Sequence, residues 1–250
     1  MLELKSVSKT FNLGTANELK ALDGLNLTVT EGEFITVVGG NGSGKSTMLN
    51  AVAGVFPIDT GNIIIDGVDV TNMPAYKRAK YIGRVFQDPM VGSASSMSIE
   101  DNLAFASRRG KIRTLKWRIT QKEREAYKEA LSQLGLNLEN RLADRVGLLS
   151  GGQRQALTLL MATLSKPNIL LLDEHTAALD PKTAKMVISL SEMLVLKHKM
   201  TTLMVTHNMS DALRYGTRVI MMGQGKVVYE AQGEKKEKLT TTEMVEMFSL

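Results

Sequence analysis

The stretch GGNGSGKST, at residues 39–47, decides the fold of this chain. It satisfies the pattern G-x-x-x-x-G-K-[ST] and stands between an expected strand at 34–38 and an expected helix at 46–53. Glycines let the backbone curl so that its N–H groups point inward, and the helix N-terminus adds partial positive charge. The stretch therefore predicts a loop that holds nucleotide phosphates. It does not distinguish kinases, GTPases and ATPases.

Two side chains of this loop have individual predicted roles. Lys45 is expected to reach the β- and γ-phosphates and to act in catalysis, and the Ser46 hydroxyl is expected to bind Mg²⁺. A glycine-rich turn that holds nothing is the alternative, which the full match in this context disfavours. The predicted nucleotide contacts from the loop are Gly39, Gly40, Asn41, Gly42, Ser43, Gly44, Lys45, Ser46 and Thr47.

Two acids follow an apolar strand in the sequence NILLLDE, at residues 168–174. Ligands of open α/β sheets bind at the carboxyl ends of the strands. Asp173 is therefore predicted to hold Mg²⁺, directly or through water, and Glu174 to polarise the water that attacks the γ-phosphate. Alternatively, Glu174 is only an acid that favours the dipole of the next helix. The phosphate loop upstream favours the catalytic role.

A second glycine-rich helix start is the sequence LSGGQ, at residues 149–153. Ser150 can cap the helix expected at 150–164, and Gly151 and Gly152 leave N–H groups at its positive end. This arrangement predicts another anion-binding site. An ordinary capped helix start is the alternative that these residues alone would favour.

Taken together, these strings resemble the ATP-binding subunit of bacterial ABC transporters, essentially from end to end. LSGGQ resembles the signature motif of that family, ILLLDE its Walker B motif, and Gln87 in VFQDP its Q-loop glutamine. Asp180, in ALD, resembles the D-loop acid, and His207 in MVTHN resembles the switch histidine. Phe11 stands where the family stacks an aromatic ring on adenine.

The resemblance implies an α/β fold of the P-loop NTPase class. It has a RecA-like parallel sheet core, an N-terminal antiparallel β layer and a helical lobe. The alternation of buried strands with helices independently favours a parallel sheet. We expect a single cassette over residues 1–250. Its core lobe would comprise about 1–88 and 165–250, and its helical lobe about 89–164.

The resemblance also implies a mechanism with ATP and Mg²⁺. Two copies pack head to tail, so that LSGGQ of one chain closes on the γ-phosphate held by the other. His207 touches that phosphate and orients the water near Glu174, while Gln87 contacts the metal and the nucleotide. The implied metal ligands are Ser46, Gln87 and Asp173. The residues that contact nucleotide across the dimer are Ser150, Gly151, Gly152, Gln153 and Asp180.

Two local features lie outside these motifs. The family usually has proline after the Walker B glutamate, whereas this chain has His175. We interpret His175 as a loop substitution rather than a second catalytic base, because Glu174 and His207 already fill that role under the resemblance. The run EKKEK, at 234–238, is expected to be a solvated surface segment.

Composition excludes several classes of site. The 250 residues contain no cysteine, which excludes disulfides, thiolate zinc sites, Fe–S clusters and cysteine nucleophiles. The 31 basic and 26 acidic residues give a net charge of +5, without the concentrated tail that nucleic acid binding favours. No nucleic acid partner is expected. Neither a membrane span nor a secretory leader is visible, so a cytoplasmic location is expected.

The resemblance implies an integral membrane permease as a separate partner, with an extracytoplasmic substrate-binding protein acting indirectly. The chain would then lie at the cytoplasmic face of the membrane, and residues 87–102 would face the permease. Residues 108–124 carry eight Lys or Arg around Trp117. They either touch anionic head groups or the permease, or form a solvated face.

The blocks at 149–167 and 173–185 are most similar to a bacterial group of tryptophan and tyrosine uptake ATPases. This similarity implies import of an amino acid or a similar small solute. An exporter ATPase for lipoproteins or drugs would share every catalytic residue and stays open. A non-transport member, acting in DNA repair or translation, is disfavoured because this chain has one cassette and no heptad run.

Overall fold

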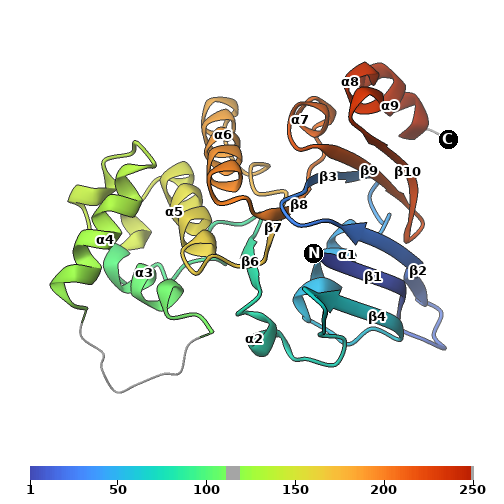
Figure 1. Ribbon diagram of the computed structural model, residues 1–250, viewed down its shortest axis with the longest axis horizontal. Helices are drawn as coiled ribbons and strands as arrows, with labels where there is room; N and C mark the ends of the chain where they lie inside the picture. The colour runs from blue at the N-terminus through green and yellow to red at the C-terminus, as the bar shows by residue number, and fades with distance from the viewer. Residues whose placement is uncertain (111–118, 249–250) are drawn as a thin grey trace.

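The computed structural model describes residues 1–110 and 119–248, which form two sheets flanked by helices (Figure 1). The strands are β1 (Leu2–Phe11), β2 (Leu19–Val29), β3 (Phe34–Gly39), β4 (Thr60–Ile65), β5 (Val68–Asp69), β6 (Ile82–Val85), β7 (Ile169–Asp173), β8 (Thr201–Val205), β9 (Arg218–Gly223) and β10 (Lys226–Gln232). The α-helices are α1 (Lys45–Ala53), α2 (Ala75–Arg78), α3 (Ile99–Ser107), α4 (Gln121–Ser132), α5 (Gly151–Thr163), α6 (Pro181–His198), α7 (Met209–Arg214), α8 (Glu234–Lys238) and α9 (Thr241–Phe248). Two 3-10 turns are η1 (Leu138–Asn140) and η2 (Val146–Leu148).

The larger sheet has six strands in the order β10-β9-β3-β8-β7-β6. Every neighbouring pair is parallel except β9 and β10. β3 and β8 are buried along their whole length, as the continuous apolar run at 34–38 predicts. Val205 of β8 pairs with both Val37 of β3 and Asp173 of β7. The carboxyl ends of these three strands therefore lie at one edge of the sheet.

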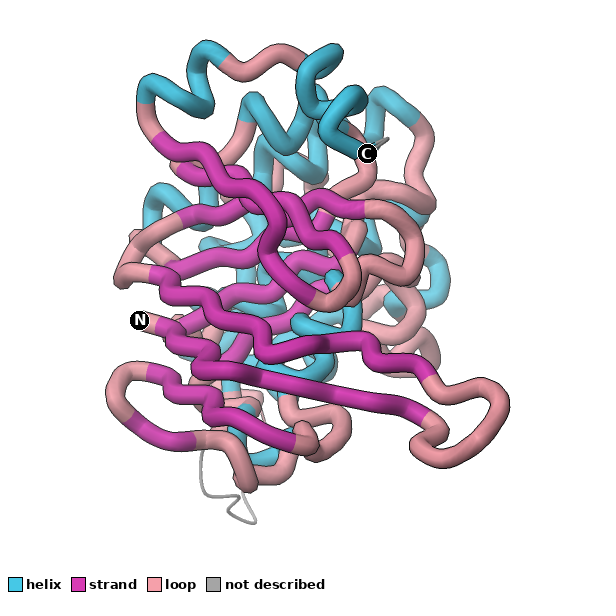
Figure 2. The backbone as a smooth tube through the Cα atoms, turned by 90° about the vertical axis from the view of Figure 1, so that its right-hand side faces the viewer, coloured by secondary structure: helices cyan, strands magenta, loops and turns pink. Residues whose placement is uncertain are grey.

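The smaller sheet is antiparallel, with four strands in the order β2-β1-β4-β5. Leu2 and Leu4 of β1 are buried against a core that includes Met48 and Leu49 of α1 and Ile35 of β3. The alternating apolar residues thus place this sheet over the helix that follows the phosphate loop. Figure 2 shows its strands on the near side, with the C-terminal helices at the top of the view. The α/β fold with an N-terminal antiparallel layer is confirmed.

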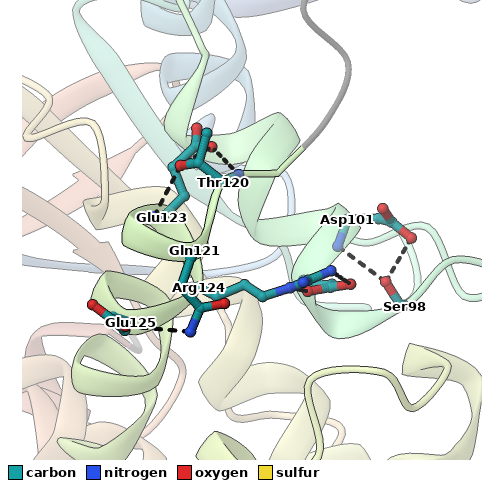
Figure 3. A network of polar contacts seen from close by, with 8 residues as sticks. Ser98, Asp101, Thr120, Gln121, Glu123, Arg124 and Glu125 are labelled. Carbon is teal, nitrogen blue, oxygen red and sulfur yellow. Dashed lines mark hydrogen bonds and ion pairs between the residues drawn. The ribbon is translucent and has the colours of Figure 1, made fainter.

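Helices α3, α4 and α5 surround a separate buried cluster drawn from residues 99–161. Thr120 caps α4 in a capping box with Glu123, and Ser98 caps α3. Arg124 of α4 bonds Glu100 of α3 through both Nε (2.7 Å) and Nη2 (3.1 Å). Figure 3 shows the two helix starts from close by, with Ser98 and Asp101 at α3 and Thr120 and Glu123 at α4. These contacts fix the starts of α3 and α4 relative to one another.

The expectation for residues 234–238 is wrong in part. The run forms α8, and one of its lysines, Lys236, is only 6% exposed. Its Nζ donates to the carbonyl of Gly216 at 2.7 Å and to that of Tyr215, just after α7. A lysine can bury its stem and use its ammonium group on carbonyls left unpaired at a helix end. The other four residues of the run are exposed, as expected.

In the part of the chain that the structure describes, no helix is long and apolar enough to cross a membrane. The basic stretch at 108–124 is described only at its two ends, because residues 111–118, including Trp117, lie outside the described residues. The two interpretations of that stretch stay predictions.

Candidate functional site

The phosphate loop joins β3 to α1 through glycines in unusual conformations. Gly42 and Gly44 have φ angles of 79° and 100°, in the region that glycine adopts without strain. A Cβ on Gly44 would lie 2.5 Å from the Ala21 carbonyl oxygen and 3.3 Å from Gly225 Cα. Gly44 is also the N-cap of α1 and offers no side-chain hydrogen bond. The first N–H groups of α1 therefore stay available to an anion.

Lys45 is buried at the start of α1, and its ammonium group turns back over the loop. Its Nζ donates to the carbonyls of Gly39 (2.7 Å) and Gly40 (3.0 Å). Burial lowers the pKa of Lys45, whereas the charges of Glu174 and Asp173 act in the opposite direction. The cation is thus held close to both acids. The Ser43 hydroxyl nearby is buried and has no partner among the described residues, which fits a ligand oxygen at this place.

Glu174 and His207 meet at the carboxyl edge of the sheet. His207 follows β8, and its Nε2 lies 2.5 Å from Glu174 Oε1. Glu174 directly follows β7, and its N–H donates to the Val205 carbonyl at 3.1 Å. Its φ is +46°, which is uncommon for a residue with a side chain and typical of functional sites. The two predicted catalytic residues, 33 positions apart, are therefore brought into contact.

Asp173 ends β7 and has a cationic neighbour that the sequence analysis missed. Arg84 of β6 approaches Asp173 Oδ2 through Nη2 at 2.8 Å, and both side chains are mostly buried. The guanidinium carbon also lies 4.6 Å from the centre of the Phe86 ring. A signal was present in the sequence, because a charged residue interrupts an otherwise apolar buried strand.

Phe11 lies at the end of β1, beside a second aromatic ring. Phe56 meets it at 5.2 Å between ring centres and 85° between planes, an edge-to-face contact. Lys9 Nζ lies 5.6 Å from the Phe11 ring and 5.7 Å from the Phe56 ring, and it pairs with Asp59 at 2.9 Å. Phe11 thus packs edge-to-face against Phe56, a residue that the sequence patterns did not single out.

The LSGGQ segment forms the start of α5, where its side chains satisfy one another. Ser150 Oγ accepts from the N–H of Gln153 at 3.3 Å, and Gln153 Oε1 accepts from the N–H of Ser150 at 3.2 Å. This capping box leaves the N–H groups of Gly151 and Gly152 at the positive end of the helix. Gly151 is exposed and Gly152 is buried.

Gly152 packs directly against the start of α6. A Cβ on Gly152 would lie 2.1 Å from Thr183 Cγ2, whereas one on Gly151 would meet Leu179 Cδ2 at an ordinary 3.5 Å. Asp180 is the N-cap of α6, and its Oδ1 accepts from the N–H groups of Lys182 and Thr183. Hydrogen bonds from Thr183 keep the pKa of Asp180 below its usual range. The LSGGQ segment therefore packs against the first turn of α6, the helix that the D-loop acid caps.

Gln155 of α5 is another residue that the sequence analysis missed. It is fully buried, and its Nε2 donates to the carbonyls of Phe86 (3.0 Å) and His175 (2.7 Å). Phe86 precedes Gln87, and His175 follows Glu174. One amide group thus connects α5 to the segment just before Gln87 and to the segment just after Glu174. Its side chain lies on the same face of α5 as Gly152, three residues earlier.

His175 is 2% exposed and does not reach solvent. Its Nε2 lies 2.9 Å from Ser191 Oγ on α6. Burial lowers the pKa of His175 to about 4, so the ring is neutral near pH 7. A neutral ring packed against a helix supports the interpretation of His175 as a loop substitution.

The structure thus gathers part of the predicted site at one edge of the sheet: Lys45, Asp173, Glu174 and His207. Among residues 1–110 and 119–248, no hydrogen bond joins the LSGGQ segment to the phosphate loop. Figure 1 shows α5 beside α3 and α4 on the left of the view, and α1 among the N-terminal strands on the right. Gln87 is exposed after β6. Of the other loop residues, Asn41 and Ser46 are exposed, Gly40 and Thr47 are half-buried, and Gly39 is buried.

The family model described as ABC transporter matches residues 22–177, more than half of the chain. The chain belongs to the ABC transporter family. The matched residues include the phosphate loop, the LSGGQ segment and the Walker B acids. This cassette is accordingly an ATPase that binds ATP and couples its hydrolysis to transport.

Individual relatives are similar to this chain over almost its whole length. The chain is 42% identical over 248 residues to the "Tyrosine transport ATP-binding protein" of Clostridioides difficile (strain R20291), covering 99% of this chain and 98% of that one. The ADP conformation of the cassette MJ1267 is similar with a TM-score of 0.82 and 26% identity, covering 100% and 98%. A dimeric post-hydrolysis state of the cassette MJ0796 with ADP and Pi gives 0.79 and 30%, covering 93% and 98%.

Proposed function

We propose that this cassette powers the import of an amino acid, with tyrosine as the first candidate, through a separate permease. The observation that carries the proposal is the 42% identity, over nearly the full length of both chains, to a protein named for tyrosine transport. Catalytic residues shared across a family cannot separate substrates. The similarity also spans residues 87–102, which would face the permease, and this supports a similar membrane partner.

In the proposed hydrolysis, Glu174 accepts a hydrogen bond from the attacking water and draws its proton away from the oxygen that attacks the γ-phosphate. His207, 2.5 Å from Glu174, orients that carboxylate and contacts the phosphate. Lys45 exchanges its carbonyl partners for phosphate oxygens and offsets their charge. No covalent intermediate is required, because positioning and charge neutralisation carry this reaction.

The donor set fits Mg²⁺, which binds hard oxygen ligands. Ser46, Gln87 and Asp173 would hold the ion, in part through water. Bound there, it would neutralise the charge of the β- and γ-phosphates. The Asp173 carboxylate is close enough to Lys45 to affect its pKa, and Ser46 is the next residue. Phe11 would stack on adenine. The phosphates would lie on the loop at 39–47.

We propose that two copies of the chain enclose two nucleotides, each supplying the segment that the other lacks. Residues 150–153 and Asp180 of one copy would contact the nucleotide on the phosphate loop of the other. The dimeric form of a similar cassette with ADP and Pi supports this arrangement. The absence of hydrogen bonds between the two segments within the described part of one chain supports it as well.

The proposed membrane partner is an integral permease, served by an extracytoplasmic substrate-binding protein, with the ATPase at the cytoplasmic face. Val91 and Met90, in the segment at 87–102, are 63% and 49% exposed.

We also propose that the cassette divides into a core lobe of about 1–88 and 165–250 and a helical lobe of about 89–164. The separate buried cluster in 99–161 supports that division.

An uptake experiment tests the substrate. In cells that carry this chain as their only copy, Lys45→Ala should reduce the uptake of labelled tyrosine to background, because the permease loses its energy source. Uptake of leucine by the same cells is the control. Unchanged tyrosine uptake, with another solute lost instead, would reassign the substrate.

A co-purification experiment tests the docking surface. Val91→Glu should reduce recovery of the permease from native membranes, because it places a charge on a segment proposed to be covered. Val228→Glu is the matched control, since Val228 on β10 is 60% exposed. Equal recovery with both variants would move the docking site elsewhere.

A further inference from the structure

Arg84 is a cation on β6, the edge strand of the larger sheet, where it faces the carboxylate proposed for the metal. On β6 its neighbours Gly83 and Val85 are buried, and the strand pairs with β7 so that Arg84 lies beside Leu171. The side chains of Arg84 and Asp173 are 13% and 14% exposed, with 2.8 Å between Nη2 and Oδ2. The ion pair is therefore largely shielded from water.

The remaining surroundings of Arg84 hold the guanidinium by a second contact besides the Asp173 carboxylate. Its Nε is buried without a hydrogen-bond partner in the described part of the chain, and its central carbon lies 4.6 Å from the Phe86 ring centre. A guanidinium stacks favourably on an aromatic face. The carbonyl of Phe86 is in turn fixed by Gln155 at 3.0 Å. Arg84 thus has a contact on an anchored ring that does not depend on Asp173.

A mostly buried carboxylate is costly without a neighbouring positive charge. Arg84 supplies that charge in the protein without metal. A divalent ion at Asp173 would supply it instead and would repel the guanidinium, because two positive charges would then share one carboxylate. The two cations therefore compete for the same group.

We propose that Arg84 is the resident counter-ion of Asp173 and that the metal must displace it, so that Arg84 sets the metal dependence of nucleotide binding. The proposal rests on the proposed assignment of Asp173 to the metal. It assigns Arg84 a positioning role, because the side chain acts through Asp173 and is not required to contact the nucleotide.

The test compares nucleotide affinity in EDTA with affinity in saturating Mn²⁺, using fluorescent mant-ATP and the Glu174→Gln background to prevent turnover. The Mn²⁺-dependent gain in affinity should be about three- to tenfold larger with Arg84→Met, which keeps the apolar stem and removes the charge. Arg84→Lys retains a positive charge but loses the planar group stacked on Phe86, so its gain should lie between those of the parent and the Met variant. An unchanged or smaller gain in the Met variant, or an equal increase in the Lys variant, overturns the proposal.

Thermal unfolding separates this role from a purely structural ion pair. In EDTA, Arg84→Met should lower the melting temperature by about 3–6 °C, because Asp173 loses its partner. With Mn²⁺ and nucleotide, most of that deficit should disappear. An equal deficit in both conditions overturns the proposal. If the Met variant does not fold, Arg84→Gln replaces it with the same expected signs.

Asp173→Asn distinguishes failure of this inference from failure of the proposed site. It should abolish most of the Mn²⁺-dependent gain, whichever residue stands at position 84. If Asp173→Asn leaves the gain intact, the metal assignment is wrong and the inference falls with it. If the gain depends on Asp173 but not on Arg84, only the inference is wrong.

Discussion

The phosphate loop and the LSGGQ segment are both glycine-rich starts of helices, but they differ in what they leave unpaired. At α1 the N-cap is Gly44, without a side-chain bond, and Lys45 donates hydrogen bonds to carbonyls of its own loop. At α5 the N-cap is Ser150, within a capping box completed by Gln153. The first segment is thus prepared for an anion, whereas the second is largely satisfied in the single chain.

This difference explains how one sequence can carry two phosphate-binding segments with unequal roles. The N–H groups and cation at α1 can bind nucleotide within one chain. The α5 segment offers fewer unpaired donors, and its own cation, Arg154, donates to the carbonyls of Gly147 and Leu149. It therefore suits a second contact to a phosphate that is already bound. Four predictions test this comparison.

The largest effect is expected at the phosphate loop. Lys45→Ala removes the cation that faces the phosphates and should reduce ATP turnover by about 100-fold or more. A phosphate-release assay measures it. An unchanged melting temperature without nucleotide is the control for folding. Turnover equal to that of the parent protein would mean that the loop does not hold the reacting phosphate.

Glu174→Gln should also reduce turnover by about 100-fold, because the attacking water loses its base, but it should leave nucleotide binding intact. The variant should accumulate as an ATP-bound dimer in sedimentation experiments with Mg²⁺. The double variant Lys45→Ala/Glu174→Gln should remain monomeric under the same conditions. A Glu174→Gln protein that is monomeric at every ATP concentration contradicts the proposed closure by LSGGQ.

Gly152 and Gly151 form a matched pair at the second segment. Gly152→Ala forces a methyl group against Thr183 and should cost about 1–3 kcal/mol of stability, whereas Gly151→Ala meets Leu179 at an ordinary distance. Gly152→Ala should also weaken ATP-dependent dimerisation while leaving ADP binding by the monomer unchanged. Chemical denaturation and sedimentation measure the two effects.

Thr183→Ser provides the control, because it removes the Cγ2 atom that the new methyl group would strike. In the Gly152→Ala background it should restore most of the lost stability. If Gly152→Ala is as harmless as Gly151→Ala, the close contact between α5 and α6 does not constrain the LSGGQ segment.

The smallest effect concerns His175, whose carbonyl accepts the bond from the α5 helix. Its folded pKa of about 4 lies below the ordinary value of 6.5, so the unfolded chain binds more protons between these pH values. The contribution of neutral His175 to the free energy of unfolding is fully present above about pH 6.5 and is lost as the pH falls toward 4. From pH 7.5 to pH 5.5 the free energy of unfolding should fall by about 1 kcal/mol through this group.

Denaturation curves at these two pH values check this expectation. His175→Gln keeps an amide nitrogen near Ser191 and removes the titrating ring, so its stability should change less over the same interval. An identical pH dependence in the parent and the variant would assign the titration to other groups.

The sequence predicts those parts of the site that lie in short local patterns. The loop at 39–47, the acids at the end of β7 and the capped start of α5 each occupy the predicted place in the chain. The parallel sheet also follows, because buried strands that alternate with helices form parallel neighbours. His207 and Glu174 were expected near one another through the resemblance, and their contact agrees with it.

The contacts that the sequence did not predict join residues far apart along the chain. Arg84 and Asp173 are 89 positions apart, and Gln155 reaches a carbonyl 69 positions away. Such pairs depend on which strands and helices become neighbours, which local periodicity does not report. Lys236 was misread for the same reason, because its partners belong to a turn 20 residues earlier.

The close approach of Gly44 and Gly225 to Ala21 has a consequence for loop length. The hairpin turn between β9 and β10 is bonded to the phosphate loop through the Gly225 N–H and the Ser43 carbonyl, 3.0 Å apart, and a Cβ on Gly225 would lie 2.8 Å from the Ala21 carbonyl oxygen. Main chain therefore meets main chain here without side chains between. A residue inserted in that turn would find no side chains there that could rearrange to make room for it. The insertion would therefore displace the phosphate loop, some 180 residues earlier in the chain.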